Sequence, residues 1–248
     1  MASAIYRTLR ADKIIETQSR LQQRIAKRFP GSGLSEVAAE LKTVAEEAVV
    51  RAHDIRRPNI LLRIVVAALL VGALALAAVM ARALHVQADL GEVLNLAQFL
   101  ESSLGSIVFL GAALLFLITL EIRLKRRRAL AALHELRALA HVIDMHQVAK
   151  DPEGLVRRGP ILSEAPDQTT KTLFDLNRYL NYCVELLAII SKIAALYVQD
   201  FPDANAVAAV DQIEALCSGL SQKISQKILI LEEILDDPGQ AGAARRSA

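Results

Sequence analysis

The chain has 248 residues, of which 53% are hydrophobic and 23% are charged, and its formal net charge is +2. A membrane bundle would have fewer charged residues and a disordered chain fewer apolar ones, so this composition predicts folded flanks around any membrane segment. The small net charge produces no broad positive field, and we therefore expect no nucleic-acid partner.

Two helices are predicted at the N-terminus, over residues 3–28 and 34–57, separated by a Pro-Gly-Ser-Gly run at 30–33. In the second helix the apolar residues alternate spacings of three and four, which is typical of a helix face that packs against another helix. This face comprises Leu34, Ala38, Leu41, Ala45, Ala48, Ala52 and Ile55. Residues 1–59 are therefore predicted to form a helical cytoplasmic segment.

Two apolar stretches, residues 64–81 and 104–120, contain no Asp, Glu, Lys, Arg or His. At a helical rise of about 1.5 Å per residue they cover roughly 27 Å and 25 Å, close to a hydrocarbon core of about 30 Å. Both are apolar on all sides, whereas a buried helix of a soluble core is usually shorter or apolar on one side. We therefore expect a two-pass transmembrane helical hairpin over residues 60–122, and a pair of soluble core helices is the alternative.

Basic residues flank the two stretches on the same side of the predicted hairpin. They are Arg56, Arg57 and Arg63 before the first stretch, and Arg123, Lys125, Arg126, Arg127 and Arg128 after the second. Because positive residues concentrate on the cytoplasmic side, both termini are predicted to be cytoplasmic, in an inner or plasma membrane. The same residues would attract anionic lipid headgroups at about 1 kcal/mol each, although their role in topology alone suffices to explain them.

The interval between the stretches is slightly acidic and contains a helix-start signal. Asp89 and Glu92 have the spacing of an N-cap residue and an acid at the third helical position. One interpretation is a short helix lying at the outer membrane interface. The other is that these residues begin a longer second membrane helix.

After the second stretch the helical pattern continues without a breaker to residue 150, which predicts one rod from about residue 104. Residues 123–150 would be its cytoplasmic extension. Residues 151–169 contain Pro and Gly and predict a loop, and Thr172 with Asp175 resembles a capping box that starts the next helix.

A C-terminal antiparallel helical hairpin is predicted over residues 170–236, with a corner at 201–203 and a disordered tail at 237–248. The first of its helices keeps the three-four alternation for more than three heptads, and the apolar face of the second is interrupted only by Lys227. The two faces comprise Leu173, Leu176, Leu180, Cys183, Leu187, Ile190, Ala194 and Tyr197, and Val210, Ile213, Cys217, Leu220, Ile224, Leu231 and Ile234.

No stretch alternates with a period of two residues, so the fold class is predicted to be all-α, with a coiled-coil-like cytoplasmic bundle beside the transmembrane hairpin. Both cysteines occupy apolar helix positions, where we expect free thiols with neither a disulfide nor a metal.

The densest group of functional-looking residues on the predicted extension is His134, Glu135, His141, Asp144 and His146, and the candidate polar site within it is His134, His141 and Asp144. A zinc site on one helix would need His at i and i+4, and a di-iron bundle would need Glu-x-x-His on paired helices; neither spacing occurs. Phosphate-binding, dinucleotide and nucleophile motifs do not occur either. We therefore expect no catalytic, cofactor or metal site, and interpret the three residues as a polar layer, with a polar site as the alternative.

Together these features predict an integral membrane interaction or scaffold protein rather than an enzyme. It would self-associate as a homo-oligomer, or recruit a helical protein partner, through its cytoplasmic heptad faces. The alternative is an oligomeric pore or channel subunit that is gated by the cytoplasmic bundle, because uncharged spans can gate by dewetting. A third possibility is an enzyme that uses the region of His141 and Asp144.

Overall fold

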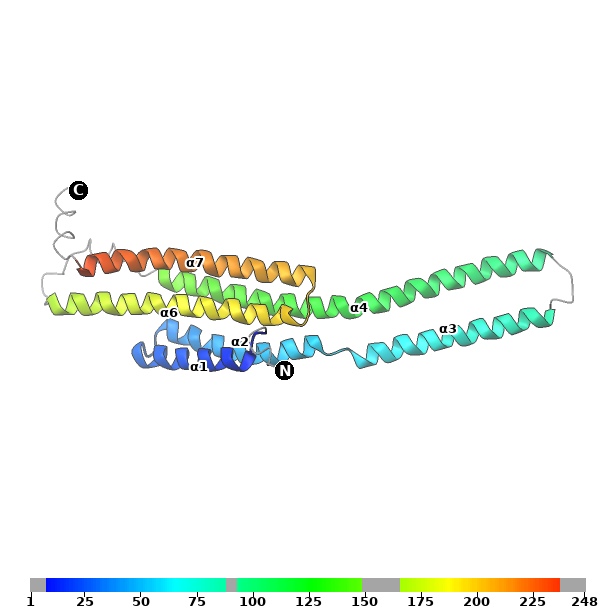
Figure 1. The fold of residues 1–248 in the computed structure, drawn as a ribbon, viewed down its shortest axis with the longest axis horizontal. Helices are drawn as coiled ribbons and strands as arrows, with labels where there is room; N and C mark the ends of the chain where they lie inside the picture. The colour runs from blue at the N-terminus through cyan, green and yellow to red at the C-terminus, as the bar shows by residue number, and fades with distance from the viewer. Residues whose placement is uncertain (1–7, 88–92, 149–165, 237–248) are drawn as a thin grey trace, which may run out of the picture. The chain divides into compact units, whose positions relative to one another are not determined.

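The computed structural model describes residues 8–87, 93–148 and 166–236, and nearly all of them are helical. The helices are α1 (Ala11–Arg28), α2 (Gly33–Arg56), α3 (Ile60–Gln87), α4 (Val93–Val148), α6 (Pro166–Gln199) and α7 (Ala204–Asp236) (Figure 1). No strand occurs in these described ranges, which confirms the all-α class.

The chain divides into two compact units. One, the helical domain, consists of Met1–Arg56 together with Ala129–Ala248; the other, the apolar hairpin, is Arg57–Arg128. Helix α4 is unbroken and contributes residues to both units.

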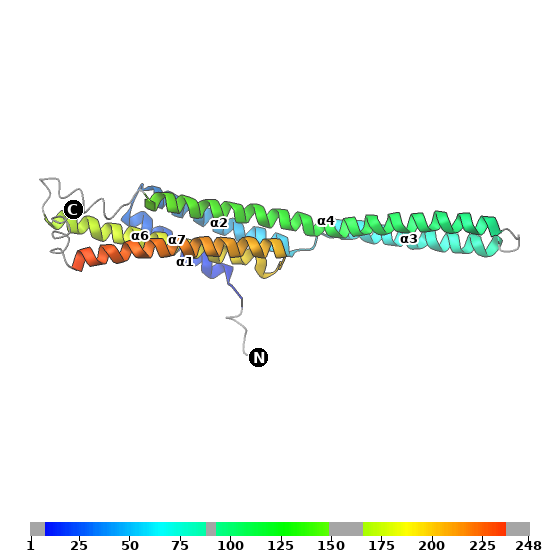
Figure 2. The ribbon, with the colours of Figure 1, turned by 90° about the horizontal axis from the view of Figure 1, so that it is seen from above.

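Helix α6 is the centre of the helical domain. It lies beside α7, which runs in the opposite direction, and it also contacts both α1 and α2 (Figures 1 and 2). All eight residues of its predicted apolar face are buried. A second set on the same helix is buried as well, because neighbours cover it from more than one side: Tyr179, Tyr182, Leu186, Ile189, Ile193 and Leu196.

The predicted faces of α2 and α7 are also buried, inside the helical domain of the same chain. On α2 every predicted residue is buried except Ala52, which is partly exposed, and on α7 the face is buried from Val210 to Leu231 apart from the interruption at Lys227. The side chain of Ile234 lies outside the described residues. The C-terminal part of α4 completes this core with six residues: Ala129, Ala132, Leu133, Leu136, Ala140 and Ile143.

The turn between α1 and α2 is anchored on α6. Gly31 adopts φ +68°, a left-handed conformation that glycine reaches without strain. The Ser32 hydroxyl accepts a hydrogen bond from the Ser35 N–H at 3.2 Å and so caps α2. Phe29 packs edge-on against Tyr179 and Tyr182, with ring centroids 5.5 Å and 6.2 Å away.

Ion pairs on the surface join the same helices. Arg24 of α1 pairs with Glu185 of α6, and Arg28 pairs with Asp175 at 2.6 Å. Arg51 of α2 pairs with Glu135 of α4 at 2.6 Å, and this hydrogen bond is the main cause of a raised Arg51 pKa. Such exposed pairs contribute little individually, so the apolar core provides most of the stability.

The structure differs from one predicted helix start and favours one of the two interpretations of another. Helix α6 begins at Pro166, because proline suits the first helical position; Thr172 and Asp175 therefore lie inside the helix rather than at its start. Helix α4 runs without a break from Val93, which supports the longer second helix over a separate interfacial helix. Asp89 and Glu92, like residues 1–7, 149–165 and 237–248, lie outside the described residues.

Candidate functional site

Among the side chains that the structure describes, the apolar hairpin has no buried interior. None of its described side chains between residues 57 and 128 is buried. Large apolar side chains are exposed on both helices, among them Leu61 (73%), Leu74 (70%) and Phe109 (79%). Contiguous apolar surface of this kind marks a membrane or an interaction site, because water solvates it poorly.

Two stretches of the described residues are long and apolar enough to cross a membrane, by length and composition. The first, Gly33–Val79, includes residues 64–79 of the predicted first span, and none of its most apolar window is buried. The second is Leu173–Gln199, whose window is 56% buried because it is the core helix α6. The predicted second span, residues 104–120, includes side chains outside the described set, at 106, 107 and 118.

A charged cluster joins the two helices at the end of the hairpin where α3 begins. Asn59 caps α3 by accepting a hydrogen bond from the Leu62 N–H at 3.4 Å, and its own N–H donates to Glu121 Oε1 at 3.2 Å. Lys125 Nζ lies 2.9 Å from the same carboxylate, and Arg63 Nε lies 4.0 Å from it. The hydrogen bond from Lys125 is the main cause of a lowered Glu121 pKa, so this carboxylate is ionised near neutral pH.

The predicted lipid-headgroup and topology residues divide between the two units. Arg56 belongs to the helical domain, where it lies 3.6 Å from Asp200. The others belong to the apolar hairpin, which brings Arg63 and Lys125 together at Glu121. No carboxylate in the described part of the chain lies within 4.0 Å of the remaining arginines Arg57, Arg123, Arg127 and Arg128, all of which are exposed. Arg126 has a partner and is half-buried.

The histidine region of α4 does not form one site. His134 and His141 are exposed, whereas Asp144 is half-buried and accepts a hydrogen bond from Gln147 Nε2 at 2.7 Å. Within the described ranges, no three His, Cys, Asp or Glu side chains are grouped so that they could hold a metal ion.

The sequence did not predict a polar contact between Gln147, the hydrogen-bond partner of Asp144, and Lys227 of α7. Gln147 is 2% exposed, and its Oε1 accepts a hydrogen bond from Lys227 Nζ at 2.8 Å. The signal for this contact was the lysine that interrupts the apolar face of α7. Nearby, Cys183 is a free, buried thiol, and burial raises its pKa to about 12. It is therefore a poor nucleophile.

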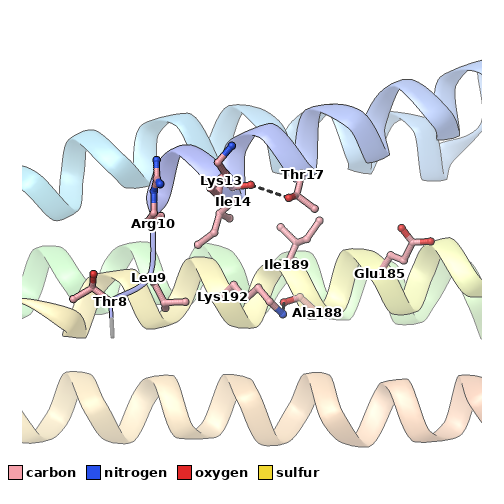
Figure 3. A pocket seen from close by; sticks show the side chains of 10 residues that line it. All are labelled: Thr8, Leu9, Arg10, Lys13, Ile14, Thr17, Glu185, Ala188, Ile189 and Lys192. Carbon is pink, nitrogen blue, oxygen red and sulfur yellow. Dashed lines mark hydrogen bonds between the residues drawn. The ribbon is translucent and has the colours of Figure 1, made fainter. Parts of the chain in front are cut away.

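A groove of about 690 Å³ lies between α1 and α6 of the helical domain, and sequence analysis did not predict it. Figure 3 shows that its lining combines aliphatic and charged side chains from the two helices and from the residues just before α1. The lining residues are Thr8, Leu9, Arg10, Lys13, Ile14, Thr17, Glu185, Ala188, Ile189 and Lys192. Such a lining suits an amphipathic segment better than a small polar substrate.

Most cationic side chains that line the groove are paired with a neighbouring carboxylate, whereas Lys192 is available to bind a ligand. The Leu9 N–H donates to Gln199 Oε1 at 2.7 Å, which holds the chain before α1 on α6. Arg10 pairs with Asp12 at 2.5 Å and Lys13 pairs with Glu16 at 2.7 Å. Among the described residues, Lys192 Nζ donates a hydrogen bond to the Ala188 carbonyl at 3.4 Å and has no carboxylate within 4.0 Å, so its charge can reach a ligand.

Comparison with known proteins gives no match to a family model, to a curated protein or to a solved structure. The features that bear on function are the exposed described side chains of the apolar hairpin, the charged cluster at its end, and the open groove on the helical domain.

Proposed function

We propose that this chain is an integral membrane interaction protein. The apolar hairpin spans the bilayer twice and keeps both termini in the cytoplasm, and the helical domain binds a protein partner or a second copy of the chain. The role is structural rather than enzymatic.

One observation carries the membrane assignment: the hairpin's large apolar side chains are exposed, and none of its described side chains is buried. Removing a leucine-sized side chain from water is favourable by about 1.5–3 kcal/mol. A hairpin with this surface would associate or aggregate in water, whereas a bilayer supplies the surroundings that it needs.

The orientation rests on charge. The cluster of Arg57, Arg63 and residues 123–128 lies at the end of the hairpin where the chain enters α3 and leaves the second apolar stretch. Retention of positive charge on the cytoplasmic side supports cytoplasmic termini.

Partner binding is assigned to the groove rather than to the heptad faces. Those faces are buried within the helical domain, so they are not available to another chain. The groove between α1 and α6 is open, and Lys192 favours an acidic amphipathic helix.

Affinity capture and size measurement of the full chain in detergent test the proposal. Ala188→Trp, which fills the groove, and Lys192→Glu should abolish the partner or the oligomer. Lys223→Glu, a matched charge reversal at an exposed position outside the lining, should leave it intact. A strict monomer without a captured partner, or equal losses in all three variants, would contradict this assignment.

A specific observation favours a second candidate, a pore subunit. Helix α4 runs unbroken from Val93 to Val148, so one continuous helix contributes residues both to the apolar hairpin and to the helical domain. A rearranged domain could then act on the spans of an oligomer. Conductance in reconstituted bilayers would support this role, and a bilayer that stays silent would leave the interaction protein as the proposal.

A further inference from the structure

A second groove, of about 290 Å³, lies on the apolar hairpin between α3 and α4. One part of its lining is aliphatic and the other is charged. The aliphatic residues are Leu62, Val66, Ala67, Leu70 and Leu117, and the charged residues are Arg63 and Glu121.

The order of these residues along the helices gives the groove a charged end and an apolar end. On α3 the lining residues recur every three or four positions, which places them on one side of the helix. Leu70 is seven positions beyond Arg63, or about 10 Å along the axis at the helical rise. On α4, Leu117 precedes Glu121 by one turn, so both helices lead from charge into the apolar stretch.

The charged end has a guanidinium available for an anion. The Glu121 carboxylate is already bound by Lys125 at 2.9 Å and by the Asn59 N–H at 3.2 Å. Arg63 Nε lies 4.0 Å from it, at the limit of an ion pair, and its side chain is 67% exposed. A guanidinium presents N–H donors in a fork that matches the oxygens of a phosphate group.

The surrounding charge also favours an anion over a neutral headgroup. Arg57, Arg123 and Arg127 belong to the same unit, are exposed, and have no carboxylate of the described residues within 4.0 Å. They raise the local positive potential for any headgroup at this end of the hairpin.

We propose that this groove binds one anionic phospholipid of the cytoplasmic leaflet. Its phosphate contacts the Arg63 guanidinium, and one acyl chain lies along Leu62, Val66 and Leu70. The inference rests on the proposed membrane insertion of the hairpin and adds to it a specific lipid partner.

Native mass spectrometry of the full chain in detergent, titrated with phosphatidylglycerol or with phosphatidylcholine of the same acyl chains, tests the site. The first phosphatidylglycerol should bind more tightly than phosphatidylcholine. Arg63→Gln should weaken phosphatidylglycerol binding about fivefold or more, which corresponds to the loss of one charge near an anionic headgroup. Arg63→Lys should retain most of the preference.

Two further variants separate the groove from charge in general. Ala67→Phe fills the groove without changing charge, so it should weaken the binding of both lipids. Arg82→Gln removes the same charge from the same helix outside the groove lining, so it should change phosphatidylglycerol binding less than twofold.

The site is overturned if the two lipids bind equally, if Ala67→Phe leaves phosphatidylglycerol binding unchanged, or if Arg82→Gln weakens it as much as Arg63→Gln. Competition by free glycerol phosphate would show a headgroup site without an acyl groove, and would also overturn it. If Ala67→Phe instead breaks a dimer, a second copy of the chain occupies the groove. Extraction of the chain from membranes by alkaline carbonate would refute the proposed function itself, whereas a retained chain without lipid preference refutes only this site.

Discussion

Leucine has opposite surroundings in the two units of this protein. Leu180, Leu186 and Leu187 of α6 are completely buried by neighbouring helices, whereas Leu61 and Leu74 of α3 are 73% and 70% exposed. Helices α3 and α6 each contribute to a stretch that is long and apolar enough to cross a membrane by length and composition. What distinguishes them is whether the rest of the chain covers their side chains. Coverage by the chain, rather than hydropathy alone, therefore separates a core helix from a candidate membrane helix.

The largest expected effect comes from placing a charge in the covered helix. Leu187→Asp puts an unpaired carboxylate at a position with 0% exposure, and should destabilise the helical domain by about 4 kcal/mol or more. Ala188→Asp, one residue along on the exposed side, should cost less than about 1 kcal/mol. Thermal unfolding followed by circular dichroism in detergent measures both. Equal melting temperatures for the two variants would mean that α6 is not covered.

The next test places a charge on the uncovered helix. Leu74→Arg would be harmless on a water-exposed surface, but at the centre of a membrane span it should cost about 3 kcal/mol, or about 100-fold in insertion. Val50→Arg is the matched control, because Val50 is 62% exposed on the helical domain. Insertion is read from glycosylation mapping and carbonate extraction. Unchanged insertion of Leu74→Arg would remove the difference between the two units.

A smaller effect is expected inside the helical domain at its buried polar contact. Lys227→Met leaves Gln147 Oε1 without its hydrogen bond from Nζ, which should destabilise the domain by about 1–3 kcal/mol. The double variant Lys227→Met with Gln147→Leu should recover part of the loss, since the buried Gln147 amide is then absent, but Asp144 loses the hydrogen bond from Gln147 Nε2. Unfolding of the single and double variants gives the coupling. If the losses of unfolding free energy in the two single variants simply add up in the double variant, the contact contributes nothing specific.

The smallest effect concerns Glu121 on the apolar hairpin. Its pKa is lowered in the folded chain, so its stabilisation is present above the unfolded pKa of about 4.3 and is lost as pH falls through the lower folded value. Glu121→Gln should therefore cost less than about 1 kcal/mol at pH 7, and this cost should shrink as the pH is lowered below the unfolded pKa. Melting temperatures of both proteins across this range test the sign. A difference that grows in acid would contradict the assignment.

Periodicity predicted the buried faces well, because a core contact and a partner contact require the same spacing of apolar residues. For that reason it could not tell that Leu41 and Ile190 face helices of their own chain. It also missed the second buried side of α6, with Tyr182 and Ile193, since a helix covered from several directions has no single stripe.

The polar details were less predictable. Gln18 is fully buried and donates from Nε2 to the Ala38 carbonyl at 2.8 Å, yet nothing in its sequence neighbourhood sets it apart from an exposed glutamine. The groove between α1 and α6 depends on which helices pack together, so it is a property of the tertiary arrangement. The basic residues were found by their clustering, but only the structure places Arg63 and Lys125 at one carboxylate.

The helical domain is discontinuous in the chain, since its two parts lie before and after the apolar hairpin. During translation, α1 and α2 emerge from the ribosome well before α6, the helix that both of them contact. At about 5–20 residues per second, this interval lasts on the order of ten seconds. The nascent α2 therefore has an incompletely covered apolar face while the hairpin is being synthesised, which makes this period the one in which a chaperone is most needed.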